Sequence, residues 1–474
     1  MNTDEYDLIV LGGGAVGENV ADRAVQGGLT AVIVESELVG GECSYWACMP
    51  SKALLRPAQA LRAAQHVAGA AEAVTGRLDV SAVFARRDSF TSNWSDDGQV
   101  AWLDSAGIDL VRGFGRLTGE REVTVTGPDG ATRVLRARHA VAISTGSDAA
   151  IPPIDGIRES APWTSREATS AKELPESLAV IGGGVVAVEM ATVYASLGST
   201  VTVIARGDLL TSMEPFAGER VAAGLRELGV DVRTGTGTMS VRRDESGVTL
   251  TLDDGGEVTA SEVLVATGRS PRSGDIGLET VGLEPGGWIS TDDTLRVPGV
   301  DWLYAVGDVT GRALLTHQGK YQARAAGDVI AARAKGKTVD AGEWGRHVAT
   351  ADHAAVPQVT FSAPEVASVG LTERAARKAG KAIEVVDYDL GRVAGASVYE
   401  DGYEGQARLV IDTERDVILG ATFVGPEVAE LLQAATVAVV GEVPIARLWH
   451  AVPAYPTISE IWLRLLEAYG RDSA

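Results

Sequence analysis

Cysteine is scarce in this sequence, acidic residues outnumber basic ones, and long apolar runs are missing. Only two cysteines occur among 474 residues, and 64 acidic against 42 basic residues give a formal net charge of -22. Such a chain would repel phosphate backbones and anionic lipids, so we expect neither nucleic acid nor membrane as a partner. No apolar run approaches the roughly 20 residues of a membrane span. The first expected strand begins at Tyr6, which argues against a signal peptide, and we expect a cytoplasmic protein.

The sequence does contain enough apolar residues for several cores. Hydrophobic residues make up 45% of the chain, and its length predicts two to four domains. Because cytoplasmic thiols are kept reduced, we expect the two cysteines to cycle between thiol and disulfide rather than to staple the fold. We assign no metal ligands.

A complete dinucleotide-binding pattern occupies residues 6–35. An apolar strand leads into Gly12, Gly14 and Gly17, an alanine-rich helix follows, and a second strand ends at Glu35. Gly12 permits the tight turn, Gly14 lets a pyrophosphate approach the helix N-terminus, and Gly17 allows close packing of helix on strand. Glu35 is placed to accept hydrogen bonds from a ribose.

The pattern recurs at residues 178–204, with Gly182, Gly184 and Ala187 in the glycine-turn positions. Two such units predict two bound dinucleotides. The second strand ends in Ala205-Arg206, where a site for NADH would carry an acid that holds the 2′-hydroxyl. An alanine followed by a cation suits a 2′-phosphate, so we favour NADPH over NADH; a solvated surface role for Arg206 is the alternative.

The cysteines, Cys43 and Cys48, are five residues apart and directly follow the first unit. On an ideal helix their Cα atoms would be roughly 8 to 9 Å apart, beyond the roughly 7 Å limit for a disulfide. A bridge therefore requires a distorted turn. We expect a helix through residues 51–56, with both cysteines in its first turn, where the helix dipole favours a thiolate. Two idle buried thiols are the alternative.

The segment Gly40-Gly41-Glu42-Cys43-Ser44-Tyr45-Trp46-Ala47-Cys48-Met49-Pro50-Ser51-Lys52 resembles the active-site stretch of the FAD-dependent pyridine nucleotide-disulfide oxidoreductases. This is the family of dihydrolipoamide dehydrogenase, glutathione reductase and mercuric reductase. The resemblance implies that Cys48 contacts the flavin and that Cys43 is the outer thiol that exchanges with a substrate. It also implies that Lys52 and Glu189 form an ion pair that tunes the flavin and the nicotinamide pocket; two solvated surface charges are the alternative.

Further motifs of the same family follow in the expected order, and the resemblance extends over essentially the whole chain. It adds further cofactor-binding residues, which are Thr145, Gly146, Asp308 and His317 for FAD and Gly268 for NAD(P)H. His317 opens a helix that the resemblance places beneath the flavin. The implied fold class is α/β, with two Rossmann-like dinucleotide-binding domains (glutathione reductase-like) and a C-terminal α+β dimerisation domain. The implied domains are 1–150 with 280–345 for FAD, 151–279 for NAD(P)H, and 346–474 for the homodimer interface.

The chain departs from the dithiol-reducing members near its C-terminus. They carry His-Pro-Thr-x-x-Glu, whose histidine is the acid/base of thiol exchange and whose glutamate orients it. Here the segment runs from Tyr455 to Glu460, and the resemblance implies that these two residues belong to the catalytic site. A phenol is a poor base at neutral pH, and a positioned base is typically worth about 10²- to 10⁴-fold in rate. His450 is out of register, and we regard it as a structural residue more readily than as a substitute base. The further cysteine pairs of mercuric and large thioredoxin reductases are missing.

We therefore expect a homodimeric FAD enzyme that passes hydride from NAD(P)H through FAD and a Cys43-Cys48 disulfide to an acceptor. An acceptor that needs no strong exchange base, such as a quinone, a small electrophile or a reactive disulfide, fits best. A disulfide reductase of dihydrolipoamide dehydrogenase type is the first alternative. Soluble transhydrogenases share Tyr-Pro-Thr and an aromatic segment but lack the second cysteine, and a flavin-based redox sensor is the last alternative.

Overall fold

The computed structural model describes residues 3–470. Its contacts group the chain into two units, each made of three segments. The first unit comprises Met1–Pro50, Asp88–Ala149 and Arg269–Asp352, and the second comprises Ser51–Arg87, Ala150–Gly268 and His353–Ala474. The sequence predicts three domains with other boundaries than these two units, and that division stays a prediction. No helix within residues 3–470 is long and apolar enough to cross a membrane.

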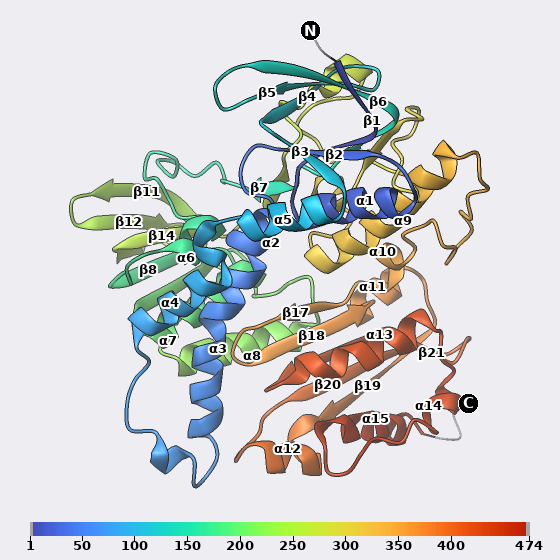
Figure 1. Cartoon of the computed structure of the whole chain (residues 1–474). Coiled ribbons are helices and arrows are strands. Elements are labelled where there is room, and N and C mark those ends of the chain that lie inside the picture. Colours follow the sequence, from blue (N-terminus) through green and yellow to red (C-terminus); the bar gives the residue numbers. More distant parts are fainter. Residues whose placement is uncertain (1–2, 471–474) are drawn as a thin grey trace. The chain divides into compact units, whose positions relative to one another are not determined.

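A seven-stranded sheet forms the centre of the first unit (Figure 1). Strands β3, β2, β1 and β6 are parallel neighbours in that order; β5 and β4 extend the sheet antiparallel, and β16 pairs in parallel with β6. The strands are β1 Thr3–Leu11, β2 Ala31–Glu35, β3 Ile108–Arg112, β4 Phe114–Gly119, β5 Glu122–Thr126, β6 Thr132–Ile143 and β16 Leu303–Ala305, with β7 Ser147–Ala149 and β15 Arg269–Pro271 as a separate pair.

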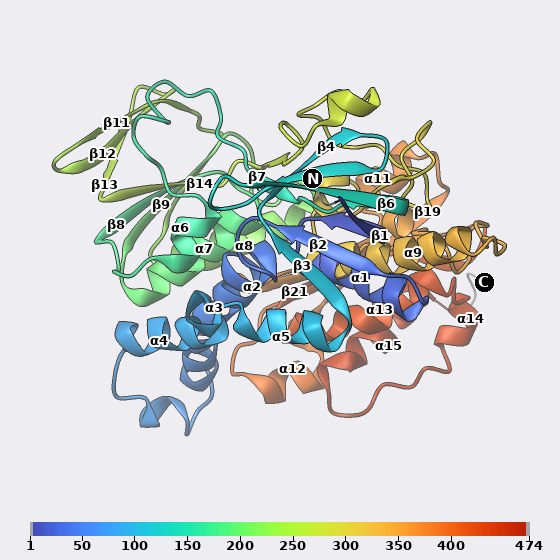
Figure 2. The same cartoon turned by 45° about the horizontal axis from the view of Figure 1, so that its top comes forward.

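Both faces of this sheet are covered, which explains why its strands are continuously apolar. Alternate residues of β1 belong to different cores, Leu8 and Val10 to one and Ile9 and Leu11 to the other. Helices α1 (Ala15–Gln26) and α9 (Thr316–Ala334) cover the first of these faces and lie side by side in Figures 1 and 2.

The second unit contains a parallel sheet in the order β10-β9-β8-β14, a three-stranded meander and a five-stranded antiparallel sheet in the order β17-β18-β21-β20-β19. Helices α13 (Leu432–Val440) and α15 (Ile461–Tyr469) pack on the antiparallel sheet (Figure 1). The strands are β8 Ser177–Ile181, β9 Thr200–Ala205, β10 Asp231–Thr234, β11 Thr238–Asp244, β12 Gly247–Leu252, β13 Glu257–Ala260, β14 Glu262–Val265, β17 Gln358–Thr360, β18 Glu365–Gly370, β19 Ile383–Asp389, β20 Gln406–Asp412 and β21 Val417–Gly425.

The remaining helices connect or cover these sheets. They are α2 Gly41–Tyr45, α3 Cys48–Gln65, α4 Val80–Phe90, α5 Asp97–Ser105, α6 Ser165–Ser170, α7 Val185–Leu197, α8 Pro215–Glu227, α10 Ala351–Ala354, α11 Glu373–Lys378, α12 Ala394–Tyr399, α13 Leu432–Val440, α14 Ile445–Leu448 and α15 Ile461–Tyr469. Residues 335–350, which the lysine and glycine cluster at residues 335–337 predicts to be a linker, contain neither helix nor strand.

Candidate functional site

The glycine turn of the first unit has the geometry of a phosphate cradle. Gly12 has φ +100°, and a Cβ there would lie 2.3 Å from the carbonyl oxygen of Ser144. A Cβ at Gly17 would lie 2.0 Å from the Gly12 carbonyl oxygen, so this position is closely packed. The space around Gly14 is open, because the nearest atom to a Cβ there would be the Cα of Gly41, at 3.9 Å. Helix α1 begins there without a side-chain cap. Its free N–H groups and the open backbone fit a dinucleotide pyrophosphate.

Glu35 ends β2 beside this turn. Its carboxylate accepts hydrogen bonds from the backbone N–H of Gly13 (2.6 Å) and of Glu37 (2.7 Å). These bonds fix the orientation of the carboxylate and leave lone pairs for a further donor. The predicted ribose contact is therefore compatible with the position of Glu35.

The second glycine turn repeats this geometry. Gly182 has φ +133°, and a Cβ there would lie 2.2 Å from the Ala266 carbonyl oxygen, whereas nothing lies within 4 Å of a Cβ at Gly184. Helix α7 begins there without a side-chain cap, with Ala187 buried in its first turn. The turn therefore also fits a pyrophosphate. Gly268, at φ +140°, has the same open surroundings.

The cysteine segment is pinned to the first glycine turn by two glycines. The N–H of Gly40 donates to the carbonyl of Gly13 at 2.8 Å, and a Cβ on Gly41 would lie 2.8 Å from the Cα of Gly14. Both have positive φ, +109° and +59°. Glycines are thus required where the thiol segment meets the nucleotide-binding turn.

The two cysteines lie on different helices, which corrects the prediction that both occupy the first turn of one helix. Cys43 is in the short helix α2, Cys48 is the first residue of α3, and Trp46 and Ala47 lie between the two helices. The break supplies the distortion that a bridge requires. Cys43 and Cys48 are both partly exposed, and their side chains are hydrogen-bonded to each other.

The side chain of Thr316, at the start of α9, contacts this thiol pair. Its Oγ1 lies 3.3 Å from the sulfur of Cys48, and it also hydrogen-bonds to Cys43. The bond to Cys48, together with burial, raises the pKa of the Cys43 thiol well above its ordinary value, and the Thr316 hydroxyl opposes this shift. Sequence reasoning missed Thr316; a hydroxyl directly before His317, at the start of the expected helix, was the available signal.

Hydrogen bonds join the predicted flavin residue Asp308 to β7 and β15. The hydroxyl of Ser147 donates to Asp308 at 2.7 Å, and the Arg269 guanidinium donates to the Ser147 hydroxyl at 2.6 Å. Arg269 also forms an ion pair with Asp308 at 3.8 Å. Next to Ser147, Gly146 has φ +76° and the Thr145 hydroxyl donates to a backbone carbonyl at 2.6 Å. Ser147 and Arg269 were not predicted as site residues.

A buried carboxylate holds the loop around Asp308 against α9. The backbone N–H of Gly307 donates to the Gln322 side chain at 2.8 Å, and Gln322 in turn donates to Asp352 at 3.0 Å. Gln318 and Arg312 also donate to Asp352, each at 2.8 Å. His317 lies within the first turn of this helix, one residue after its start, close to where it was predicted.

Lys52 and Glu189 form the ion pair that the resemblance implied. Lys52 Nζ lies 2.8 Å from Glu189 Oε2, and the Glu189 side chain is only 4% exposed. The second oxygen of Glu189 accepts the backbone N–H of Phe361 at 2.9 Å, and Lys52 lies 5.0 Å from the centroid of the Phe361 ring. Their predicted role toward the cofactors stays a prediction.

The C-terminal residues Tyr455 and Glu460 are not brought together. Tyr455 is 75% exposed, whereas Glu460 is 5% exposed and accepts a hydrogen bond from Arg464 at 2.5 Å. Within residues 3–470, the other Glu460 oxygen has no hydrogen-bond partner. His450 is exposed. Glu460 thus binds an arginine one turn later, and its role toward residue 455 stays a prediction.

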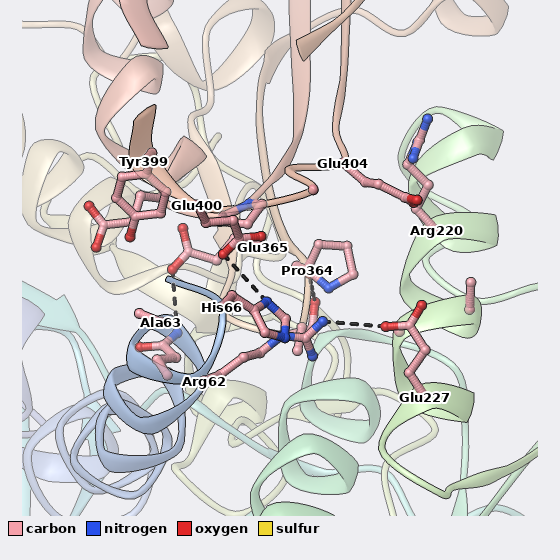
Figure 3. A pocket seen from close by; sticks show the side chains of 18 of the residues that line it. Arg62, Ala63, His66, Arg220, Glu227, Pro364, Glu365, Tyr399, Glu400 and Glu404 are labelled. Atoms are coloured by element: carbon pink, nitrogen blue, oxygen red, sulfur yellow. Dashed lines mark hydrogen bonds and ion pairs between the residues drawn. The ribbon is translucent and has the colours of Figure 1, made fainter. Parts of the chain in front are cut away.

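A separate cavity of about 310 Å³ lies in the second unit, and none of the predicted site residues lines it (Figure 3). Arg62, on α3, and His66, in the turn directly after α3, project toward Glu227 and Glu400, at 3.4 and 3.6 Å. Burial raises the pKa of Glu365, in the same cavity, to about 7, and the nearby carboxylates of Glu427 and Glu430 add to this rise.

Replacing Glu365 with glutamine should stabilise the protein increasingly between pH 5 and pH 8. The raised pKa means that folding favours the protonated carboxyl, so the cost of burying the carboxylate is absent below its ordinary pKa of 4.5 and complete above about 7. We expect a gain of about 1–2 kcal/mol at pH 8, measured by thermal unfolding across the pH range. Glu404→Gln, at an exposed position of the cavity, is the control, and equal curves for both variants would contradict the assignment.

Comparison with known proteins identifies the family. The model of the pyridine nucleotide-disulphide oxidoreductases matches residues 6–329, and that of their dimerisation domain matches residues 356–465. A dihydrolipoyl dehydrogenase of Thermus scotoductus is 34% identical, over 99% of this chain and 98% of that protein. A mercuric reductase of Streptomyces lividans is 33% identical, over 99% and 97%.

Among solved structures, the HOCl-induced flavoprotein disulfide reductase RclA of Escherichia coli superimposes with a TM-score of 0.84 at 24% identity, over 98% of this chain and 99% of that one. This likeness concerns the fold. The chain therefore belongs to the pyridine nucleotide-disulphide oxidoreductases, a family of flavoprotein oxidoreductases, and has their glutathione reductase-like α/β fold with a C-terminal dimerisation domain.

Proposed function

We propose that the protein oxidises NADPH and passes two electrons through FAD and the Cys43-Cys48 pair to an acceptor that needs no histidine base. A quinone, another small electrophile or a reactive disulfide meets this condition. The observation that carries the proposal is the thiol pair itself, because the hydroxyl of Thr316 hydrogen-bonds to both sulfurs. The position of the usual histidine base is occupied by Tyr455, which is exposed and separate from Glu460.

The residues that would hold the cofactors are those of the two glycine turns and their neighbours. A bound flavin would supply two-electron transfer between a nicotinamide and a disulfide. Lys52 and Glu189 would orient the reacting rings, Cys48 would lie toward the flavin, and Cys43 would exchange with the acceptor. The proposed FAD residues are Gly12, Gly14, Gly17, Glu35, Lys52, Thr145, Gly146, Asp308 and His317; those for NAD(P)H are Gly182, Gly184, Ala187, Glu189, Arg206 and Gly268.

The proposed assembly is a homodimer formed through residues 346–474. The match of residues 356–465 to the family's dimerisation domain supports it. So do three exposed valines of that region, Val437, Val440 and Val452, because exposed apolar side chains favour a protein partner. A cytoplasmic location agrees with a cycling disulfide.

Steady-state assays with one holoenzyme preparation test the proposal against its alternatives. NADPH oxidation should be fast with a quinone or an activated aromatic disulfide and at least about 10²-fold slower with lipoamide, because a positioned exchange base is missing. Several curated relatives are dihydrolipoyl dehydrogenases, and efficient lipoamide turnover would replace our proposal with that activity. Transfer of hydride only to a second nicotinamide would indicate a transhydrogenase, and no turnover a redox sensor.

Replacing Ala205 with glutamate should shift the preference from NADPH toward NADH. Ala205 occupies the same position in the second unit as Glu35 does in the first. A Cβ built on Gly183 would lie 3.2 Å from the Cβ of Ala205, and a Cβ built on Gly13 would lie 3.2 Å from the Cβ of Glu35. The new carboxylate would accept the N–H of Gly183 and repel a 2′-phosphate. We expect the ratio of kcat/KM for NADPH to that for NADH to fall by about tenfold or more. An unchanged ratio would sink the proposed role of Arg206.

A further inference from the structure

Two charged side chains near the thiol pair have no role in the proposal so far. Glu18, in the first turn of α1, is only 7% exposed, and its Oε1 has no hydrogen-bond partner within residues 3–470. Lys320, on α9, is partly exposed, and no carboxylate oxygen of the described chain lies within 4.0 Å of its ammonium. A buried carboxyl oxygen without a hydrogen-bond partner is unusual unless another group uses it.

Helix packing places Lys320 near Glu18 and on the helix face that contacts the thiol pair. A Cβ on Gly319 would lie 2.5 Å from the Val16 side chain, so α9 and α1 touch at the residue before Lys320 and two residues before Glu18. Figures 1 and 2 show the two helices side by side. Lys320 follows Thr316 by four residues and therefore shares the helix face on which Thr316 contacts Cys48.

The charges act on the thiol as well as on each other. The Lys320 ammonium lowers the pKa of Cys43, against the upward effects of Cys48 and burial. Burial raises the pKa of Glu18 to about 7; Lys320 opposes this rise, and Glu35 on β2 adds to it. Burial raises the pKa of Tyr45, on α2, and the carboxylates of Asp96 and then Glu18 add to this rise.

We propose that Lys320 is the fixed cation that stabilises the thiolate of Cys43, with buried Glu18 as its titrating counter-charge, in place of the C-terminal histidine that this chain lacks. The inference rests on the proposed function only in taking Cys43 as the exchanging thiol. Lys320 keeps its proton throughout and is a positioning charge. It favours ionised Cys43, whose sulfur attacks an acceptor disulfide; that S–S bond breaks, and the leaving thiolate takes a proton from solvent.

The test is the pH profile of thiol alkylation in the reduced holoenzyme. The protein is reduced with dithiothreitol without oxygen, treated with iodoacetamide between pH 5 and pH 10, and digested so that the Cys43 peptide is quantified separately from the Cys48 peptide. The variants are Lys320→Met, the charge-conserving Lys320→Arg, and Glu18→Gln. Lys337→Met, at an exposed lysine of the same unit, is the matched control for net charge.

Lys320→Met should slow alkylation of Cys43 at pH 7 about three- to tenfold by moving its profile up by about half to one pH unit. Lys320→Arg and Lys337→Met should keep the parent profile. Glu18→Gln should remove an inflection near pH 7 and speed the reaction above it, where the carboxylate of the parent protein is ionised and offsets the charge of Lys320. An unchanged Lys320→Met profile, or an equal shift in Lys337→Met, would overturn the inference. Neither alkylation result decides the proposed function, because that function is tested separately by NADPH turnover with an acceptor.

Discussion

Replacing Cys43 with serine should abolish turnover with every disulfide acceptor, by at least about 10³-fold, while NADPH still reduces the flavin. A hydroxyl cannot form the mixed disulfide, whereas the glycine turns that would hold both dinucleotides do not involve this side chain. The contact between Cys48 and Thr316, at 3.3 Å, does not depend on Cys43 either. The measurement is NADPH consumption with an activated disulfide, alongside stopped-flow absorbance of the flavin.

Ser44→Ala is the matched control for this variant, because it changes the neighbouring side chain of the same short helix. It should keep disulfide turnover within a few-fold of the parent protein. Disulfide reduction that survives in the Cys43→Ser variant would show that electrons reach the acceptor directly from the flavin. Quinone reduction that also survives would then identify which class of acceptor bypasses the thiols.

The Lys52→Met variant should lose about 2–3 kcal/mol of stability, because it leaves Glu189 buried without its cation. The Lys52 Nζ and Glu189 Oε2 atoms are 2.8 Å apart, and the side chains of Lys52 and Glu189 are 37% and 4% exposed. Because Lys52 is partly solvated, we expect a loss of stability at or below the lower end of that measured when fully buried ion pairs are broken. Thermal unfolding should shift down by roughly 5 °C. The rate of flavin reduction by NADPH should also fall if the pair orients the reacting rings.

A double-mutant cycle separates the two effects of this change. Glu189→Gln added to Lys52→Met removes the unpaired charge and keeps an acceptor for the N–H of Phe361, which now donates to Glu189 at 2.9 Å. The double variant should therefore regain stability relative to Lys52→Met without regaining the rate of flavin reduction. A double variant as unstable as Lys52→Met would mean that the ion pair contributes through packing rather than through charge.

The glycine turns could be predicted from the sequence because their requirements are local and steric. At Gly12 and Gly182 a positive φ and a carbonyl oxygen within 2.3 Å of any Cβ leave no other residue possible. The elements around them follow from short-range apolar patterns. The expected strands and helices of both dinucleotide-binding patterns are accordingly present, and the family resemblance is confirmed.

The arrangement of the thiols could not be predicted in the same way. Gly40 and Gly41, directly before Cys43, meet the first glycine turn, and this contact joins Gly40 to Gly14 across about 26 residues of sequence. Thr316 reaches Cys48 from 268 residues away, and no spacing in the sequence encodes that approach. Likewise, the motif gave no sign that Glu460 would accept a hydrogen bond from Arg464, and its role toward residue 455 stays a prediction.

The central claim is that electrons pass through Cys43 and Cys48, and an anaerobic titration of the holoenzyme with NADPH tests it most directly. Flavin absorbance is followed while the reducing equivalents taken up by each flavin are counted. The account predicts uptake of about four electrons, with a long-wavelength band from a thiolate against the flavin. Complete bleaching at about two electrons without that band would contradict it, because the thiol pair would then be idle.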